Sequence, residues 1–282
     1  MTSRAIPILT YHSWRFATDS YADNDHVALN EDLHLMGSLG FKVVSLEAAL
    51  AEVRNPTSDA PLAAITFDDG AVFDYRPVTH MHAEIDTGFF PILQKHRRHR
   101  RRLRRIQPWL HATSFVIGSG AARAQINAGL GDDFGWIGPN AWGDDWWREA
   151  HASDLMEMGN HSWDHNHPYV DTVVDCPSGD FHCIDNLDFA EKEIGDAQRQ
   201  IAQQHGFECR YFAYPWGHCN EYLSAEYLPE HGAAAGLRAA VTTEPDYLRS
   251  ETNVWKVPRF VCGDHWKNSA ELEAILRGAT VS

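Results

Sequence analysis

Two histidines four residues apart, His161 and His165, combine a metal-binding side chain with a spacing that suits one ion. They follow a Gly-Asn pair at 159–160. At a helix start or on a tight loop, positions i and i+4 fall on one face, so both imidazoles can reach the same ion. A His-rich surface loop without a metal is the alternative that this stretch leaves open.

Two adjacent carboxylates, Asp68 and Asp69, favour the metal interpretation. They follow the apolar segment 61–67, which predicts a strand, and α/β enzymes keep their active sites at strand ends of this kind. One carboxylate and two histidines form a three-ligand set with room for water, as catalytic metal sites do. The sequence therefore predicts one divalent ion, with Zn²⁺ as the first choice and Co, Ni, Mn or Fe also compatible.

A scaffold of parallel strands is needed to bring these residues together, and the segment pattern supplies one. Apolar segments typical of strands alternate along the chain with segments typical of helices. The strands are expected at 6–11, 41–44, 61–67, 111–117, 211–214, 239–242 and 257–261. The helices are expected at 30–38, 46–53, 189–205, 221–231 and 269–277. This alternation predicts an α/β fold with a parallel sheet.

Three ordered motifs resemble those of the polysaccharide deacetylase family, the NodB-homology carbohydrate esterases. They read T-F-D-D-G at 66–70, H-S-W-D-H at 161–165 and F-A-Y-P-W-G at 212–217. The opening I-L-T-Y-H at 8–12 is similar to the first strand of one branch of that family. The resemblance runs from about residue 6 to 276 and implies a distorted (β/α) barrel of about seven parallel strands.

The chain also departs from the family pattern. Residues 1–282 are expected to form a single domain, with 71–110 as an extra insertion. Within it, the basic run 95–105 holds eight Lys or Arg and no acid, in a chain of net charge −15. Such a run could bind an anionic polymer, or it could be a solvated helix extension that pairs with the protein's own acids. It contains no aromatic residue, which argues against a single-stranded nucleic acid as partner.

The resemblance also implies roles for the metal-site residues. Asp69, His161 and His165 match the metal ligands, and Asp68 matches the general base. Two adjacent carboxylates cannot serve equally, because the metal holds one ionised while the other is free to take a proton. The implied reaction is attack on an acetyl carbonyl by a water whose pKa the metal lowers, with Asp68 removing the proton.

Further residues are expected around this centre. Substrate and oxyanion contacts are implied for Tyr214, Pro215, Trp216 and Gly217, including a backbone N–H near Tyr214. His12, at the end of the first strand, is expected beside the metal site as an orienting residue, with a hydrogen-bonded core histidine as the alternative.

Two catalytic positions have no direct match. Many family members carry an Arg where this chain has Ala213, and that Arg holds the base in place. Arg259 is the candidate replacement from another strand, and a surface arginine is the alternative. The family's C-terminal L-x-H motif, which supplies the general acid, is not evident. His265 is the candidate, against an ordinary loop histidine.

The cysteines and the apolar segments bear on location. Five cysteines occur without a C-x-x-C pair; Cys176 and Cys183 are close enough in sequence to pair, but nothing in the sequence requires it. We recognise no secretory signal and no apolar run long enough to span a membrane. Reduced thiols and a cytoplasmic location are therefore expected, with an exported form open if a leader has been removed.

Three functions follow from these observations. The first is a metal-dependent deacetylase acting on N-acetyl or O-acetyl groups of a saccharide. The second is a metal-dependent hydrolase of a small amide or cyclic imide, which a cytoplasmic location and the insertion favour. The third is a non-catalytic metal-containing binding protein that uses the run 95–105, although it would have no need of the base Asp68. Neither a membrane nor a nucleic acid is expected as partner, and the oligomeric state is left open.

Overall fold

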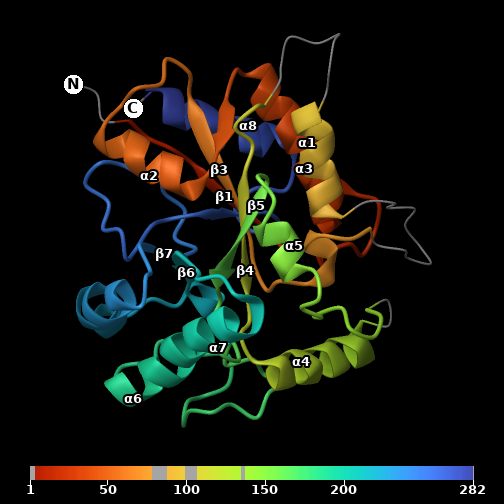
Figure 1. The fold of residues 1–282 in the computed structure, drawn as a ribbon. Coiled ribbons are helices and arrows are strands. Elements are labelled where there is room, and N and C mark those ends of the chain that lie inside the picture. Colours follow the sequence, from red (N-terminus) through yellow and green to blue (C-terminus); the bar gives the residue numbers. More distant parts are fainter. Residues whose placement is uncertain (1–3, 78–87, 99–106, 135–136, 282) are drawn as a thin grey trace.

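A computed structural model describes residues 4–77, 88–98, 107–134 and 137–281. Its centre is a sheet in which every pairing of strands is parallel (Figure 1). The strands are β1 (Ile8–Tyr11), β2 (Lys42–Val44), β3 (Leu62–Phe67), β4 (Ala112–Val116), β5 (Met156–Asn160), β6 (Tyr211–Ala213), β7 (Ala239–Val241) and β8 (Phe260–Val261). Their order is β7-β6-β5-β4-β3-β1-β8, and β2 also pairs with β3.

The sheet curves into a half-barrel, as the resemblance implies. Val241, the last residue of β7, forms a parallel bridge with Val257, which precedes β8 in the chain. The amide of Thr242 also donates to the carbonyl of Val257 at 2.8 Å. These contacts bring the two ends of the strand order toward each other. The expected α/β fold with a distorted barrel of parallel strands is confirmed, and the barrel is a half-barrel.

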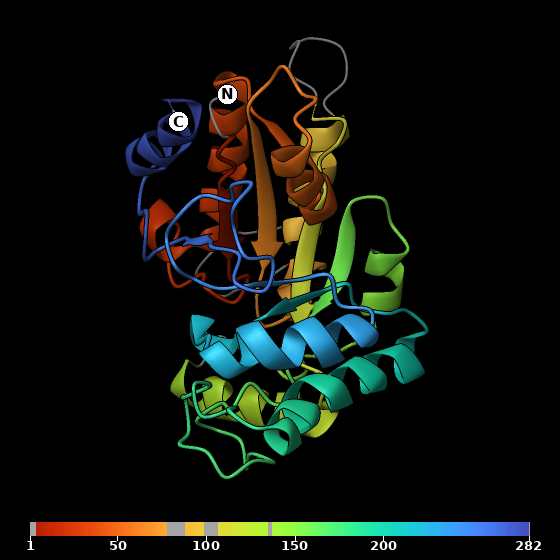
Figure 2. The same cartoon turned by 90° about the vertical axis from the view of Figure 1, so that its left-hand side faces the viewer.

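Helices lie around the sheet, as Figures 1 and 2 show. One group lies at one end of the molecule: α1 (Asp25–Ser38), α3 (Phe89–Arg98) and α8 (Ser269–Val281). A second group lies at the other end: α4 (Gly120–Asp133), α6 (Leu187–Ala190) and α7 (Asp196–His205). The remaining α-helices are α2 (Leu46–Arg54) and α5 (Trp147–His151), and wider π-helical turns occupy Glu191–Gly195 and Leu223–Gly232. Short 3-10 turns occupy Tyr21–Asp23, Val72–Asp74 and Pro215–Gly217.

Side-chain caps set the first residues of helices α1 and α2. The hydroxyl of Ser45 accepts a hydrogen bond from the amide of Ala48, which is the predicted N-cap of α2. Helix α1 begins earlier than expected, because the side-chain oxygen of Asn24 caps it by accepting hydrogen bonds from the amides of His26 and Val27. Helix α4 was not predicted, and α8 continues beyond Gly278.

The tryptophan-rich stretch 118–150 divides between core and pocket. Trp146 and Trp147 are fully buried and belong to the main hydrophobic core. Trp142 is also buried, but it lines the pocket described below. Core packing is therefore the main role of the tryptophans that the structure describes here.

Part of the insertion 71–110 is described, and it packs against the rest of the fold. Arg97, in α3, forms an ion pair with Asp154 at 2.5 Å, and the ammonium of Lys95 lies 3.3 Å from the side-chain oxygen of Asn30. The described start of the basic run thus pairs with the protein's own polar surface. Residues 78–87 and 99–106 lie outside the described residues, and so does most of the run.

A disulfide joins Cys176 to Cys183, so the expectation of reduced thiols is wrong for this pair. Cys209, Cys219 and Cys262 carry free thiols. Within the described ranges, no helix has both the length and the apolar character needed to cross a membrane.

Candidate metal and catalytic site

The carboxyl ends of neighbouring strands bring the predicted site residues to one edge of the sheet. Tyr11 of β1 lies in register with Phe67 of β3, so His12 and Asp68 leave adjacent strands at the same level. On the other side of β4, β5 ends at Asn160, directly before His161. The parallel register therefore gathers side chains from positions that are far apart in the sequence.

The turn after β3 needs residues that accept a left-handed backbone. Asp69 has φ of 72° and Gly70 has φ of 65°. A β-carbon at Gly70 would lie 2.7 Å from the side chain of Val116, so glycine also meets a space requirement there. This turn points Asp69 toward His161 and His165, while Asp68 faces Arg259.

The histidine motif forms a tight loop, which is one of the two geometries considered from the spacing. Ser162, His165 and Asn166 have φ of 69°, 65° and 42°. The amide of Ser162 donates to the side-chain oxygen of Asn160, and the amide of His165 donates to the hydroxyl of Ser162. These short-range bonds fold the loop so that both imidazoles lie on the same side.

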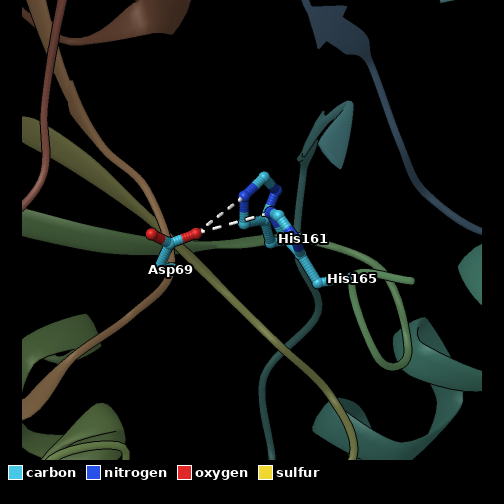
Figure 3. Close-up of side chains that lie close together, drawn as sticks. All are labelled: Asp69, His161 and His165. Atoms are coloured by element: carbon cyan, nitrogen blue, oxygen red, sulfur yellow. Dashed lines mark ion pairs between the residues drawn. The ribbon is translucent and has the colours of Figure 1, made fainter. Parts of the chain in front are cut away.

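Asp69, His161 and His165 form one cluster, shown in Figure 3. The Oδ1 atom of Asp69 lies 3.4 Å from Nε2 of His161 and 3.5 Å from Nε2 of His165. Bonds of about 2.0–2.2 Å to a tetrahedral ion would separate such ligand atoms by about 3.3–3.6 Å. The cluster therefore fits a divalent first-row ion by donor type and by spacing.

Neighbouring groups orient two of these ligands. Nδ1 of His161 lies 2.9 Å from the carbonyl oxygen of Ala213; when it donates there, Nε2 presents its lone pair to an ion. The indole Nε1 of Trp14 donates to Oδ2 of Asp69 at 2.7 Å, which leaves Oδ1 for the histidine side. Sequence reasoning missed Trp14, and its position two residues after His12 was the signal available.

Burial and mutual charge set the protonation of the cluster. Burial would raise the pKa of Asp69, but its hydrogen bond with His161 and the nearby histidine charges hold that pKa well below its usual range. Burial, with the charge of His161 beside it, lowers the pKa of His165 to about 3. By contrast, burial alone would lower the pKa of His161, but the hydrogen bond with Asp69 and the charges of Asp68 and Asp69 outweigh burial and raise that pKa. Asp69 and His165 are thus held in the forms that bind a metal, and a bound ion would displace the proton of His161.

Asp68 is paired with Arg259 rather than with the histidines. Nη1 and Nη2 of Arg259 donate to Oδ1 and Oδ2 of Asp68, each at 2.7 Å. Nε of Arg259 donates to the carbonyl of Thr242, and Nη1 also donates to the hydroxyl of Thr66. Arg259 is fully buried, so the alternative of a surface arginine is excluded.

This pairing keeps Asp68 ionised. Burial alone would raise the pKa of Asp68, but the guanidinium of Arg259 and the imidazole of His161 lower it below its usual value. Each carboxylate oxygen has two acceptor sites in general, so bidentate pairing leaves acceptor capacity free on Asp68.

Most of the predicted site residues line one pocket with a volume of about 650 Å³. From the predicted set, the lining includes His12, Asp68, Asp69, His161, His165, Trp216, Gly217 and His265. Trp14 and Trp142 also line it. Sequence motifs from both halves of the chain thus meet in a single cavity.

Tyr214 does not have the place that the sequence led us to expect. Its amide donates to the carbonyl of Val241, and its buried hydroxyl donates to the carbonyl of Trp255. Both donors of Tyr214 are therefore committed within the fold, so an oxyanion contact from a backbone N–H near Tyr214 would have to come from another residue, and that contact stays a prediction. Neither Tyr214 nor Pro215 lines the pocket, so substrate-side contact from this motif falls to Trp216 and Gly217.

His265 lies in the pocket wall with one nitrogen committed. Its Nδ1 accepts a hydrogen bond from the amide of Val261 at 2.7 Å, so the neutral ring carries its hydrogen on Nε2. Burial lowers the pKa of His265, which disfavours a second proton on the ring. By contrast, Nδ1 of His12 is buried and has no hydrogen-bond partner within the described part of the chain.

The sequence matches the model of the polysaccharide deacetylase family over residues 55–235. The matched span contains Asp68, Asp69, His161 and His165, and it leaves out the segments that carry His12, Arg259 and His265. No curated protein matches the chain.

Solved structures with the same fold match nearly the whole chain. IcaB from Ammonifex degensii is 20% identical with a TM-score of 0.63, and the match covers 98% of this chain and 97% of that one. The Streptococcus pyogenes deacetylase PplD, solved with acetate, is 18% identical with a TM-score of 0.60, covering 98% and 99%. A de-N-acetylase from Aggregatibacter actinomycetemcomitans is 14% identical with a TM-score of 0.60, covering 96% and 99%.

Proposed function

Since the chain belongs to the polysaccharide deacetylase family, we propose that it is a metal-dependent hydrolase that removes acetyl groups from an N-acetylated or O-acetylated saccharide. The observation that carries this proposal is that the adjacent residues Asp68 and Asp69 have different partners, one suited to a general base and the other to a metal ligand. Asp69 faces the two histidines, while Asp68 is held ionised by Arg259, and all of these groups except Arg259 line one pocket.

The residues divide the work of hydrolysis. Asp69, His161 and His165 would hold the divalent ion, which when bound supplies Lewis-acid chemistry for water and for a carbonyl group. Asp68 would take the proton of the attacking water on an oxygen that Arg259 leaves partly free. Arg259 touches only the base, so we assign it a positioning role.

Release of an amine from an amide also needs a proton for the departing nitrogen. The sequence suggested His265 as the donor, but its Nδ1 already accepts from a backbone amide, and a doubly protonated ring would lose that bond. His12 lines the same pocket without such a commitment at Nδ1. We therefore move the proton-donor role to His12 and give His265 the role of a hydrogen-bond donor to substrate through Nε2.

Aromatic side chains at the pocket support a saccharide substrate. Trp216 and Tyr169 both line the pocket, and they are 41% and 37% exposed. The indole of Trp216 is fixed in place, because its Nε1 donates to the carbonyl of His165 and its ring stacks on His167. Exposed aromatic faces bind the apolar faces of sugar rings, a contact that a small amide would not need.

The disulfide bears on the alternatives. A bond between Cys176 and Cys183 favours an oxidising compartment over the cytoplasm that the sequence led us to expect. That change weakens the proposal of a small amide or cyclic imide as substrate, since it rested in part on a cytoplasmic location. The binding-protein alternative is weakened by the paired base Asp68, which such a protein does not need.

One domain is proposed for residues 1–282. Strands β1 and β8 lie outside the span of the family match, yet β1 pairs with β3 and β8 pairs with β1 in the same sheet. Arg259 from the end of the chain is buried against Asp68. The added segments thus complete the site that the matched span begins.

The proposal is tested by acetate release from N-acetylglucosamine oligomers, from an O-acetylated saccharide and from small amides and imides of matched concentration. We expect release from a saccharide substrate, loss of that release after treatment with a chelator, and recovery on adding Zn²⁺. Turnover of a small amide or imide alone would overturn the saccharide assignment. Release that chelation leaves unchanged would overturn metal dependence.

A further inference from the structure

A second cluster of metal-ligating side chains, Asp180, His182 and His218, lies apart from the catalytic pocket. The three candidate ligand atoms all lie within 4.8 Å of one another. Oδ1 of Asp180 is 3.1 Å from Nδ1 of His182 and 3.5 Å from Nδ1 of His218. One carboxylate and two imidazoles at such distances form the same donor set as the catalytic cluster.

The loop that carries two of these ligands is held in shape without a metal. The disulfide between Cys176 and Cys183 closes it around Asp180 and His182. The side-chain amide of Asn166 donates to the carbonyls of Pro177 and Asp180, each at 2.7 Å. A ligand cluster on such a loop needs little further ordering to bind an ion.

The third ligand is fixed against this loop. Asn220 donates its side-chain amide to the carbonyl of His182 at 2.8 Å, and it follows His218 closely in the chain. The rings of His182 and His218 stack with centroids 4.2 Å apart and an interplanar angle of 27°. The segment after the catalytic turn and the disulfide loop are thus already in contact.

The imidazole of His218 is in the form that binds a metal. Its Nδ1 accepts a long hydrogen bond of 3.3 Å from the amide of Phe181, so this nitrogen carries a lone pair rather than a hydrogen, and it lies 3.5 Å from Oδ1 of Asp180. Oδ1 of Asp180 also accepts from the amide of His182 at 2.9 Å, but a carboxylate has further acceptor sites.

We propose that Asp180, His182 and His218 form a second metal site, which binds a first-row divalent ion such as Zn²⁺. Binding would exchange two hydrogen bonds for bonds to the ion: the long contact of Phe181 with His218, and the contact between Nδ1 of His182 and Oδ1 of Asp180. The side chains of Asp180 and His182 are 42% and 54% exposed, so solvent can fill the remaining coordination position. The ion would tie the disulfide loop to the segment that directly follows Trp216 and Gly217 of the pocket wall.

Metal stoichiometry in a background without the catalytic carboxylate tests this proposal. The Asp69→Ala protein, with its disulfide intact, is dialysed to equilibrium against buffered free Zn²⁺, and metal per chain is measured. Addition of His182→Ala to this background should remove about one further Zn²⁺ per chain. Addition of His218→Gln, which retains an acceptor for Phe181, should do the same. Addition of His231→Ala, a partly exposed histidine outside both clusters, should remove none.

Thermal unfolding gives a second readout on the same proteins. An ion that binds only the folded chain raises the unfolding temperature with its concentration. Zn²⁺ should therefore raise the unfolding temperature of Asp69→Ala and of its His231→Ala derivative, but not that of the His182→Ala derivative. Equal metal content and equal Zn²⁺ response in all of these proteins would overturn the second site.

The outcome is separate from that of the proposed catalytic function. In an otherwise unchanged chain, His182→Ala should lose one metal and keep acetate release, whereas Asp69→Ala should lose one metal and also acetate release. One metal lost only with Asp69→Ala would overturn the second site and leave the catalytic proposal standing. One metal lost only with His182→Ala would do the reverse.

Discussion

Arg259 holds both carboxylate oxygens of Asp68 in a bidentate pair with distances of 2.7 Å, although 191 positions separate the two residues in the chain. The pair is buried, and the guanidinium also donates to the carbonyl of Thr242. Segment 257–261 forms a bridge with β7 and pairs with β1. It brings the guanidinium of Arg259 to Asp68 in a chain that has Ala213 where many family members carry an arginine. If Asp68 is the base that we propose, a buried pair of this kind links catalytic activity to the stability of the fold.

Replacement of Arg259 by Met tests that link. The variant leaves Asp68 buried without its partner, so we expect a loss of about 3–5 kcal/mol in the free energy of unfolding at neutral pH. Acetate release should fall by about 10²- to 10⁴-fold, the usual contribution of a general base. The double variant Arg259→Met with Asp68→Asn should regain stability without regaining activity. An Arg259→Met protein with unchanged turnover would contradict the assignment.

The same pair predicts a pH dependence of stability. The folded-state pKa of Asp68 lies below its unfolded value, so its stabilising contribution is present above the unfolded pKa and is lost as pH falls through the folded pKa. In Arg259→Met, burial dominates and raises that pKa, so the contribution of Asp68 becomes less favourable as pH rises. Denaturant unfolding at several pH values should therefore show that the contribution of Asp68 to the free energy of unfolding rises with pH in the wild type and falls with pH in Arg259→Met. Parallel pH profiles would show that Arg259 does not set the charge of Asp68.

The hydrogen bond from Trp14 to Asp69 should strengthen metal binding. Trp14→Phe keeps an aromatic ring but removes the indole N–H that donates to Oδ2 of Asp69. Loss of such an outer contact typically weakens metal binding by about 10- to 100-fold. Competition with a chelator measures this affinity, and Trp109→Phe, an exposed tryptophan outside the pocket, is the matched control. Equal affinities in the two variants would remove Trp14 from the site.

The two pocket imidazoles should behave differently in catalysis. His12→Gln is expected to lower kcat/KM on an N-acetyl substrate by about 10²- to 10⁴-fold and to remove the limb of the pH profile where activity falls as pH rises. His265→Gln should keep that limb, because the ring of His265 already accepts from Val261 and does not deliver a proton in this account. A lost limb in His265→Gln with a retained limb in His12→Gln would restore the assignment made from sequence.

Seven of the eight described strands could be anticipated from apolar segments, and the cluster of Asp69, His161 and His165 could be anticipated from motifs of fixed spacing. Strand β5, which leads directly into His161, was missed, because Glu157, Gly159 and Asn160 interrupt its apolar pattern. Asp69 and the two histidines follow strand ends, and a parallel register brings strand ends together without further information. The roles assigned to these residues are still predictions.

Contacts that depend on backbone pairing were beyond reach of the sequence. Tyr214 was expected to contact substrate, with a backbone N–H near it for the oxyanion, but the N–H of Tyr214 itself is used by the pairing with Val241. His265 was named as the candidate proton donor, and the sequence does not show that its Nδ1 accepts from the amide of Val261. Trp14 was missed since its donation to Asp69 crosses from one strand end to another. Each of these facts requires the three-dimensional path of the chain.

Metal content and acetate release, measured together on wild type and on Asp69→Ala, test whether hydrolysis depends on a metal held by Asp69. Asp246→Ala, which removes an exposed carboxylate outside the pocket, is the control. We expect Asp69→Ala to lose about one metal per chain and its acetate release, while the control keeps both. An Asp69→Ala protein that keeps its full metal content and still releases acetate would contradict the account.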